Sequence, residues 1–427
     1  MRKLLLFLFV FSGFVLNAQI EEIRRITKQL CSPEFHGRGY VNKGDSLAAD
    51  YLVSEFKKLG VDSYKKINYL QPFSIQGINR FPDVMSVKHG EKELTPGVHF
   101  MIDPTSSGGK MELNPVVIDG RRLIKGPDLE FDQNYIRSKI EHFGNDGKNC
   151  YLLDIGGIGK DTTKVVMGLS SALCEFGPVI EVMDRKFTYS VGRSQMKHPL
   201  IYIQDSIYQE GQSFTIDINA EFVENYNSQN VLAYLPAKKM CAKTVVFTAH
   251  YDHLGRMGAN TYFPGGNDNA SGTAMLLTMA KYFKENPSNY NIMFIAFAGE
   301  EAGLVGSRYF VENTPIKLKK IRFLLNLDIM GSGEDGITAV NSTVHEEEFK
   351  LLQSINEEKV LLKKVKKRGP TSNSDHYWFT QEGVPAFFIY TMGLNQNYHD
   401  VFDTYENLSF NEYEDITKLL VTFVERL

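Results

Sequence analysis

Six ionisable side chains lie at the ends of segments with the pattern of buried strands, or in the loops that follow them. They are His250, Asp268, Glu300, Glu301, Asp328 and His399. In an open α/β sheet the carboxyl ends of parallel strands lie along one edge, and ligands bind there. Side chains that are far apart in this sequence can therefore meet at one site.

Each of these residues alone is typical of something simpler, such as a packed histidine, a helix cap or a solvated pair of glutamates. Their coincidence at successive strand ends favours a shared site. Three carboxylates brought together would repel one another or take up protons. Two Zn²⁺ ions would balance Asp268, Glu301 and Asp328 once a bridging hydroxide is counted. Histidine and carboxylate ligands suit Zn²⁺, with Co²⁺ or Mn²⁺ as substitutes.

The elements expected to position these residues begin near Gln229, where apolar segments alternate with helical patterns. Strands are expected at 231–235, 243–249, 292–298, 321–327 and 385–390, and helices at 271–283 and 304–312. Near-continuous apolar strands separated by helices predict a mostly parallel mixed sheet with helices on both faces. The fold class is therefore α/β.

The rest of the chain predicts a second unit. Residues 21–60 have helical patterns, clearest at 46–58. Between 84 and 224, short β-type segments alternate with Gly, Pro and Asp turns, and 134–143 is the clearest helix. We therefore expect residues 19–83 and 225–427 to form one α/β domain and 84–224 to form a β-rich insert.

The first 18 residues have the pattern of a signal peptide. A basic pair, Arg2 and Lys3, precedes the apolar segment Leu4–Leu16, and Ala18 is the small residue expected before cleavage. The apolar segment is too short to span a bilayer as a helix. We expect an exported periplasmic or extracellular protein with no stable membrane insertion after cleavage. An uncleaved anchor is the alternative.

Composition excludes two broad classes. With 43% apolar residues the chain can build a core, which argues against disorder. A formal charge of −4 argues against general nucleic-acid binding.

The four cysteines, Cys31, Cys150, Cys174 and Cys241, form no C-x-x-C pair. Export permits disulfides. Cys150–Cys174 is the favoured pairing, and buried free thiols are the alternative.

Five segments carry a family resemblance: HYDHLG, GGNDNASGTAMLL, FAGEEAGLVGSRYF, LNLDIMG and YHDVFDTYENL. Together and in this order they resemble the M28 family of zinc metallopeptidases, which are aminopeptidase-like enzymes with two co-catalytic zinc ions. The resemblance covers residues 229 to 427 and the N-terminal segment CSPEFHGRGYVNKG. The insert resembles a protease-associated-type β domain, for which a lid or selectivity role is one interpretation.

The resemblance implies a metal-binding role for five residues. Asp268 would bridge two zinc ions. His250 and Asp328 would complete the ligands of one ion, and Glu301 and His399 those of the other.

The resemblance also implies roles around the metals. Glu300 would be the general base, and Tyr398 would polarise the scissile carbonyl. Asp252 would hold the imidazole of His250 by its other nitrogen. A cis peptide bond is implied between Asp268 and Asn269. His253 is expected near the cleft as a supporting group.

The function that follows is a secreted di-zinc aminopeptidase, a hydrolase whose partners are peptide substrates. A glutaminyl-peptide cyclotransferase with one zinc is an alternative, although such relatives tend to carry a long insertion where Glu301 and Gly306 here lie close. A carboxypeptidase or dipeptidase of the same fold and a non-catalytic binding module are further alternatives. The sequence leaves open the side-chain preference, the role of the insert, the oligomeric state and the physiological metal.

Overall fold

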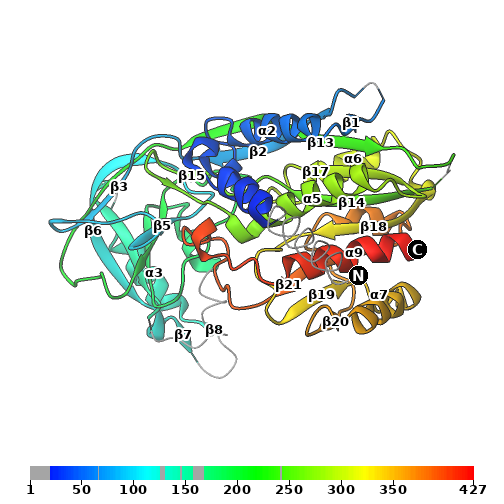
Figure 1. Ribbon diagram of the computed structural model, residues 1–427. Helices are drawn as coiled ribbons and strands as arrows, with labels where there is room; N and C mark the ends of the chain where they lie inside the picture. Colours follow the sequence, from blue (N-terminus) through cyan, green and yellow to red (C-terminus); the bar gives the residue numbers. More distant parts are fainter. Residues whose placement is uncertain (1–19, 66, 126–129, 145–146, 157–167, 241–242) are drawn as a thin grey trace.

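Two large β-sheets organise the protein, one at each end of the molecule (Figure 1). The computed structural model describes residues 20–427 except 66, 126–129, 145–146, 157–167 and 241–242. The predicted signal peptide and Cys241 lie outside the described residues. Among the helices of the described part, none combines the length and the apolar character needed to cross a bilayer.

The first sheet has nine strands in the order β1-β13-β17-β14-β18-β21-β19-β20, with β2 paired to β13. The bounds are β1 (Asp62–Ser63), β2 (Leu70–Arg80), β13 (Glu221–Leu235), β14 (Thr244–His250), β17 (Asn291–Phe297), β18 (Ile321–Leu327), β19 (Gly336–Val340), β20 (Val365–Lys367) and β21 (Ala386–Met392). The central strands β17, β14, β18 and β21 are parallel, and β13 and β19 join them antiparallel. The predicted mixed α/β sheet is confirmed.

Helices cover both faces of this sheet. One face packs against α2 (Gly44–Lys58), α5 (Gly272–Glu285), α7 (Glu346–Lys359) and α9 (Tyr413–Arg426), and the other against α6 (Val305–Glu312) and α8 (His376–Gln381). Side chains alternate between the faces of a strand. In β14, Phe247 therefore joins the α5 side, while Val246 joins Phe310 of α6 and Phe379 of α8. Burial on both faces explains why the strand sequences are almost continuously apolar.

The second sheet has eight strands in the order β4-β3-β12-β6-β9-β10-β11-β5. The bounds are β3 (Met85–His89), β4 (Lys92–Glu93), β5 (Phe100–Ile102), β6 (Gly109–Asp119), β9 (Asn149–Asp154), β10 (Val179–Met183), β11 (Leu200–Gln204) and β12 (Phe214–Ile218). All eight strands fall within the predicted insert. The predicted boundary between residues 224 and 225 falls inside β13, a strand of the nine-stranded sheet. The exact division into two domains therefore stays a prediction.

Smaller elements connect these layers. They are α3 (Gln133–Glu141), the pairs β7 (Ile124–Lys125) with β8 (Glu130–Phe131) and β15 (Arg256–Met257) with β16 (Thr261–Tyr262), and the short helical turns η1 (Pro33–Arg38), η2 (Gly120–Arg122), η3 (Gly266–Ser271), η4 (Leu318–Lys320) and η5 (Tyr405–Asn407). The loop after β14 carries Leu254, Met257 and Phe263 into the core of the eight-stranded sheet. The two sheets are therefore joined by packing as well as by the chain.

The favoured disulfide is wrong, because Cys150 and Cys174 are separate buried thiols, as is Cys31. Cys150 lies within β9, whereas the thiol of Cys174 lies 3.7 Å from the carbonyl oxygen of Pro199. Burial raises the pKa of both thiols to about 12. They are therefore protonated and unreactive at neutral pH.

Candidate metal centre

Three adjacent parallel strands supply most of the site. His250 is the last residue of β14, and Asp328 directly follows β18. Glu300 and Glu301 follow β17 after a turn at Gly299, whose φ is +72°. Because β17, β14 and β18 are parallel neighbours, these residues emerge at the same edge of the sheet.

Asp268 reaches the same edge from the turn η3, at the start of α5. The Asp268–Asn269 peptide bond is cis, which confirms the bond that the family resemblance implied. The side chain of Asn269 fastens this turn to the end of β18: its amide donates to the carbonyl of Leu327 at 3.0 Å, and its oxygen accepts from the N–H of Ile329 at 3.1 Å.

Asp403 holds the other side of this turn. Its two carboxylate oxygens accept hydrogen bonds from the backbone N–H groups of Asn267, at 2.8 Å, and Asp268, at 3.0 Å. Asp403 lies in the sequence segment that also contains His399. Sequence reasoning missed this role, because a buried aspartate that binds backbone groups has no distinctive spacing.

The two oxygens of the Asp268 carboxylate face two different histidines. Oδ1 lies 3.1 Å from Nε2 of His250, and Oδ2 lies 3.0 Å from Nε2 of His399. A second carboxylate accompanies each histidine: Asp328 Oδ1 lies 3.4 Å from His250 Nε2, and Glu301 Oε2 lies 3.3 Å from His399 Nε2. Asp268 therefore lies between two histidine–carboxylate pairs. The structure brings all five predicted ligands together.

Hydrogen bonds at the far side of each ring determine which nitrogen carries the proton. Nδ1 of His250 lies 3.2 Å from the backbone carbonyl of Asp252, and Nδ1 of His399 lies 3.0 Å from that of Tyr189. A carbonyl oxygen only accepts, so each Nδ1 carries a hydrogen. A neutral ring then directs the lone pair of Nε2 at carboxylate oxygens. That arrangement requires a cation between the two, so the donor set fits a bound metal.

Without a metal, a proton bound to the histidine Nε2 would have to supply the positive charge between the ring and the carboxylates. Burial opposes the charged form of His399, but Glu301 and Asp268 outweigh it and raise the pKa of His399 to about 11. Burial likewise opposes ionisation of Glu301, but His399 outweighs it and lowers the pKa of Glu301 to about 2. Glu301 is therefore held ionised beside a positive charge, which is the environment that a divalent ion needs.

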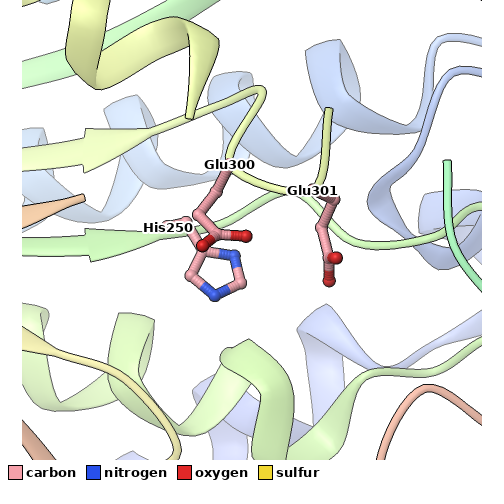
Figure 2. A group of neighbouring side chains, drawn as sticks. All are labelled: His250, Glu300 and Glu301. Carbon is pink, nitrogen blue, oxygen red and sulfur yellow. The ribbon is translucent and has the colours of Figure 1, made fainter. Parts of the chain in front are cut away.

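Glu300 differs from its neighbour Glu301. Figure 2 shows the carboxylate of Glu300 beside the imidazole of His250, while Glu301 extends into the same space from further along the loop. Burial raises the pKa of Glu300 well above its ordinary value, and Glu301, Asp375 and Asp328 raise it further. A carboxyl group with a raised pKa beside a metal centre is suited to accept and return a proton.

Asp252 touches more of the site than the sequence suggested. Its carboxylate lies 3.9 Å from Nδ1 of His250, so only its backbone carbonyl is within hydrogen-bond distance of that ring. The carboxylate instead accepts from the hydroxyl of Tyr40 at 2.9 Å and from the N–H groups of Glu300, at 3.2 Å, and Glu301, at 3.4 Å. Asp252 therefore orients the two glutamates through their backbone.

Three other residues complete the surroundings. Tyr398 is 48% exposed, and its ring stacks on the His399 imidazole with centroids 3.9 Å apart. Buried His253, expected as a supporting group, contacts Glu301 through Nδ1 at 2.8 Å. Ser374, which sequence reasoning missed, donates to Asp328 Oδ2 at 2.8 Å. Tyr398 is thus the exposed member of the set, at the rim of the site.

Comparisons with known proteins relate the part of the chain that carries these residues to a family of peptidases. Residues 230–424 match the model of peptidase family M28. Aminopeptidase YwaD of Bacillus subtilis (strain 168) is 40% identical over 110 residues, which cover 25% of this chain and 23% of that protein. A probable leucine aminopeptidase of Trichophyton verrucosum is 26% identical over 221 residues, covering 48% and 58%. The chain thus spans less than two thirds of the length of these curated relatives.

Solved structures share the fold over almost the whole chain. The zinc aminopeptidase BSAP from Bacillus subtilis has a TM-score of 0.67 at 20% identity, covering 95% of this chain and 94% of its own. A peptidase M28 precursor from Shewanella amazonensis SB2B has a TM-score of 0.64 at 15% identity, covering 94% and 96%. The likeness in fold therefore includes both sheets.

Proposed function

Since the chain carries a peptidase family M28 domain over residues 230–424, we propose that it is a di-zinc aminopeptidase. It would hydrolyse the peptide bond after the N-terminal residue of a peptide. The observation that carries the proposal is the position of Asp268, whose two oxygens lie 3.1 and 3.0 Å from the Nε2 atoms of two histidines. The names of its relatives, an aminopeptidase and a leucine aminopeptidase, support the same activity.

Five residues would hold two zinc ions. His250, Asp268 and Asp328 have donor atoms within 4.8 Å of one another and would bind one ion. Asp268, Glu301 and His399 would bind the other. When bound, two such ions supply Lewis acidity, which polarises a peptide carbonyl and acidifies water.

The protein's own residues would then perform the proton transfers. Glu300 would take a proton from the attacking water and return it to the departing amine, since its carboxylate lies beside His250 without serving as a ligand. Asp252 keeps Glu300 oriented by binding its backbone N–H. Tyr398, at the rim of the site, would donate a hydrogen bond to the carbonyl oxygen as negative charge develops there.

The proposed location is outside the cytoplasm. The first 18 residues have the basic, apolar and small-residue pattern of a signal peptide. Peptides in the periplasm or the medium would then be the substrates.

Metal analysis combined with a substrate panel tests the proposal. Elemental analysis of the purified protein should find about two zinc ions per chain. Chelation should abolish the release of N-terminal residues from aminoacyl substrates, and Zn²⁺ should restore it. Because ligand binding stabilises the folded state, chelation should also lower the melting temperature. Full activity in verified metal-free protein would contradict the proposal, and cyclisation of N-terminal Gln peptides in place of hydrolysis would indicate a cyclotransferase.

A further inference from the structure

A segment of the eight-stranded sheet reaches the metal centre of the other sheet. Residues 186–193, which we call the strap, lie between β10 and β11. The strap contacts two loops that carry candidate metal ligands. One loop carries His399 and the other carries Glu301.

The strap binds the His399 loop through a reciprocal pair of hydrogen bonds. The N–H of Tyr189 donates to the carbonyl of His399 at 2.8 Å, and the carbonyl of Tyr189 accepts from Nδ1 of the same residue at 3.0 Å. Lys186 adds an ion pair with Asp400, which is 2% exposed, and donates to the carbonyl of Gln396 at 3.0 Å. The strap thus fixes both the backbone and the ring of His399.

This bracing matters because His399 has an unfavourable backbone conformation. Its φ is +52°, in the left-handed region that non-glycine residues rarely adopt. Such a conformation is unfavourable for a residue with a side chain and persists where surrounding contacts enforce it. The hydrogen bonds to Tyr189 are contacts of that kind.

Arg193 extends the strap to the second loop. Its guanidinium donates to the carbonyl of Ala302, the residue after Glu301. It also donates to the carbonyl of Gly77 in β2 at 2.9 Å. One side chain of the strap therefore links the Glu301 loop to the edge of the nine-stranded sheet.

The other histidine–carboxylate pair has a different kind of support. His250 contacts the carbonyl of Asp252 and accepts, through its own carbonyl, from Thr273 at 2.9 Å. Asp328 accepts from Ser374 at 2.8 Å. In the described part of the chain, the hydrogen-bonding partners found for His250 and Asp328 belong to the nine-stranded sheet and its loops.

We propose that the strap positions the ligands of one metal site only, the site formed by Asp268, Glu301 and His399. The inference rests on the proposed di-zinc function. Groups that orient metal ligands from behind commonly change metal affinity by about 10–100-fold. Loss of the strap contacts should therefore weaken zinc binding at this site and leave the site of His250, Asp268 and Asp328 unchanged.

Single-site backgrounds make the test direct. Asp328→Ala leaves Glu301 and His399 as the intact pair, and Glu301→Ala leaves His250 and Asp328. Lys186→Ala is added to each background, and Zn²⁺ affinity is measured by competition with a chelator. We expect about a tenfold loss of affinity in the Asp328→Ala background and a change below about twofold in the Glu301→Ala background.

Two control variants isolate the contact. Lys186→Arg keeps the cation near Asp400 and should retain the zinc affinity. Lys110→Ala also removes a Lys–Asp ion pair from the eight-stranded sheet, the pair with Asp217 at 2.6 Å, but on β6 and β12, which β9 separates from β10 and the strap. It should leave both sites unchanged. Melting temperatures of the metal-free variants check that each is folded.

Equal weakening of both sites, or no change at either, would overturn the inference while leaving the proposed function intact. If a single-site background binds no Zn²⁺, the comparison is made on the two successive binding steps of the parent protein. A shift in one step supports the inference, and equal shifts in both overturn it. A parent protein that binds no Zn²⁺ would overturn the proposed function and the inference together.

Discussion

Parallel strands of both sheets end next to acidic residues, but the two sheets use these residues in different ways. In the eight-stranded sheet, Asp119 at the end of β6 accepts a hydrogen bond from the N–H of Arg121 at 2.9 Å. Asp154 at the end of β9 accepts from the N–H of Gly156 at 3.0 Å. Both carboxylates cap the turns that follow their own strands.

In the nine-stranded sheet, Asp328 follows β18, and within the described residues its carboxylate accepts from the Ser374 hydroxyl rather than from a backbone N–H group. Its Oδ1 is buried and lies 3.4 Å from His250 Nε2, yet among the described residues it has no hydrogen-bond partner. The comparison teaches that a carboxylate at a strand end is a candidate ligand when local N–H groups leave it unsatisfied and other ionisable groups meet it.

The largest effect is expected from Glu300→Gln. This change keeps the size of the side chain but removes its ability to accept a proton, so turnover should fall by about 10²–10⁴-fold. Zinc content should stay at the parent level, because Glu300 is not proposed as a ligand. Steady-state kinetics and elemental analysis measure both quantities. A loss below about tenfold would mean that this strand end is not the catalytic centre.

Glu301→Gln should act through the metal. A neutral amide is a poor ligand, so affinity at one site should fall by at least about tenfold, and activity with it. Excess Zn²⁺ should restore part of the activity of this variant but not that of Glu300→Gln. If Glu301→Gln kept both ions while Glu300→Gln lost one, the two roles would be reversed.

Asp119→Ala tests the other side of the comparison. It removes a turn cap, so the free energy of unfolding should fall by about 1 kcal/mol. Zinc content and turnover should match the parent, because the site lies on the other sheet. Denaturant melts give the first quantity. A loss of zinc would show that the caps of the eight-stranded sheet also influence the metal centre.

The smallest effect is expected at Glu181, a buried residue of β10 that accepts from Ser170 at 2.6 Å. Burial raises its pKa above the ordinary 4.5. The folded state therefore binds this proton more tightly than the unfolded chain, and stability is lost as pH rises from 4.5 through the raised pKa. The free energy of unfolding of Glu181→Gln, relative to that of the parent, should therefore increase between pH 4 and pH 8, by less than about 1 kcal/mol.

Urea melts at both pH values measure the Glu181 effect. Glu175→Gln, a change at an exposed neighbour, serves as the control and should show no such trend. A parent and a Glu181→Gln variant with the same pH dependence would contradict the expected contribution of Glu181.

Much of the site geometry could be predicted from the sequence, because its residues follow strands that are easy to recognise. β14 and β18 are mostly apolar; β14 ends at one candidate ligand, His250, and β18 is directly followed by another, Asp328. The same logic could have found α9, where Ile416, Leu419 and Phe423 recur at helical spacing and are buried, but this helix was missed. β19, α7 and α8 were also missed, since their segments are short or mostly polar.

The supporting contacts could not be predicted. Tyr189 holds His399 through backbone atoms, and a backbone carbonyl leaves no mark in the sequence. Asp403 binds backbone N–H groups of a turn that lies far earlier in the sequence; Asp268 in that turn is 135 positions away. Such contacts depend on tertiary packing, which periodicity does not encode.

The packing of the loop after β14 sets a limit on recombination between relatives. Met257 and Phe263 are fully buried in the core of the eight-stranded sheet, although the chain returns from this loop directly to Asp268. An exchange of the eight-stranded sheet for that of a relative would leave these two side chains facing foreign residues. Residues 254–263 must therefore be exchanged together with that sheet, although they are separate from it in the sequence.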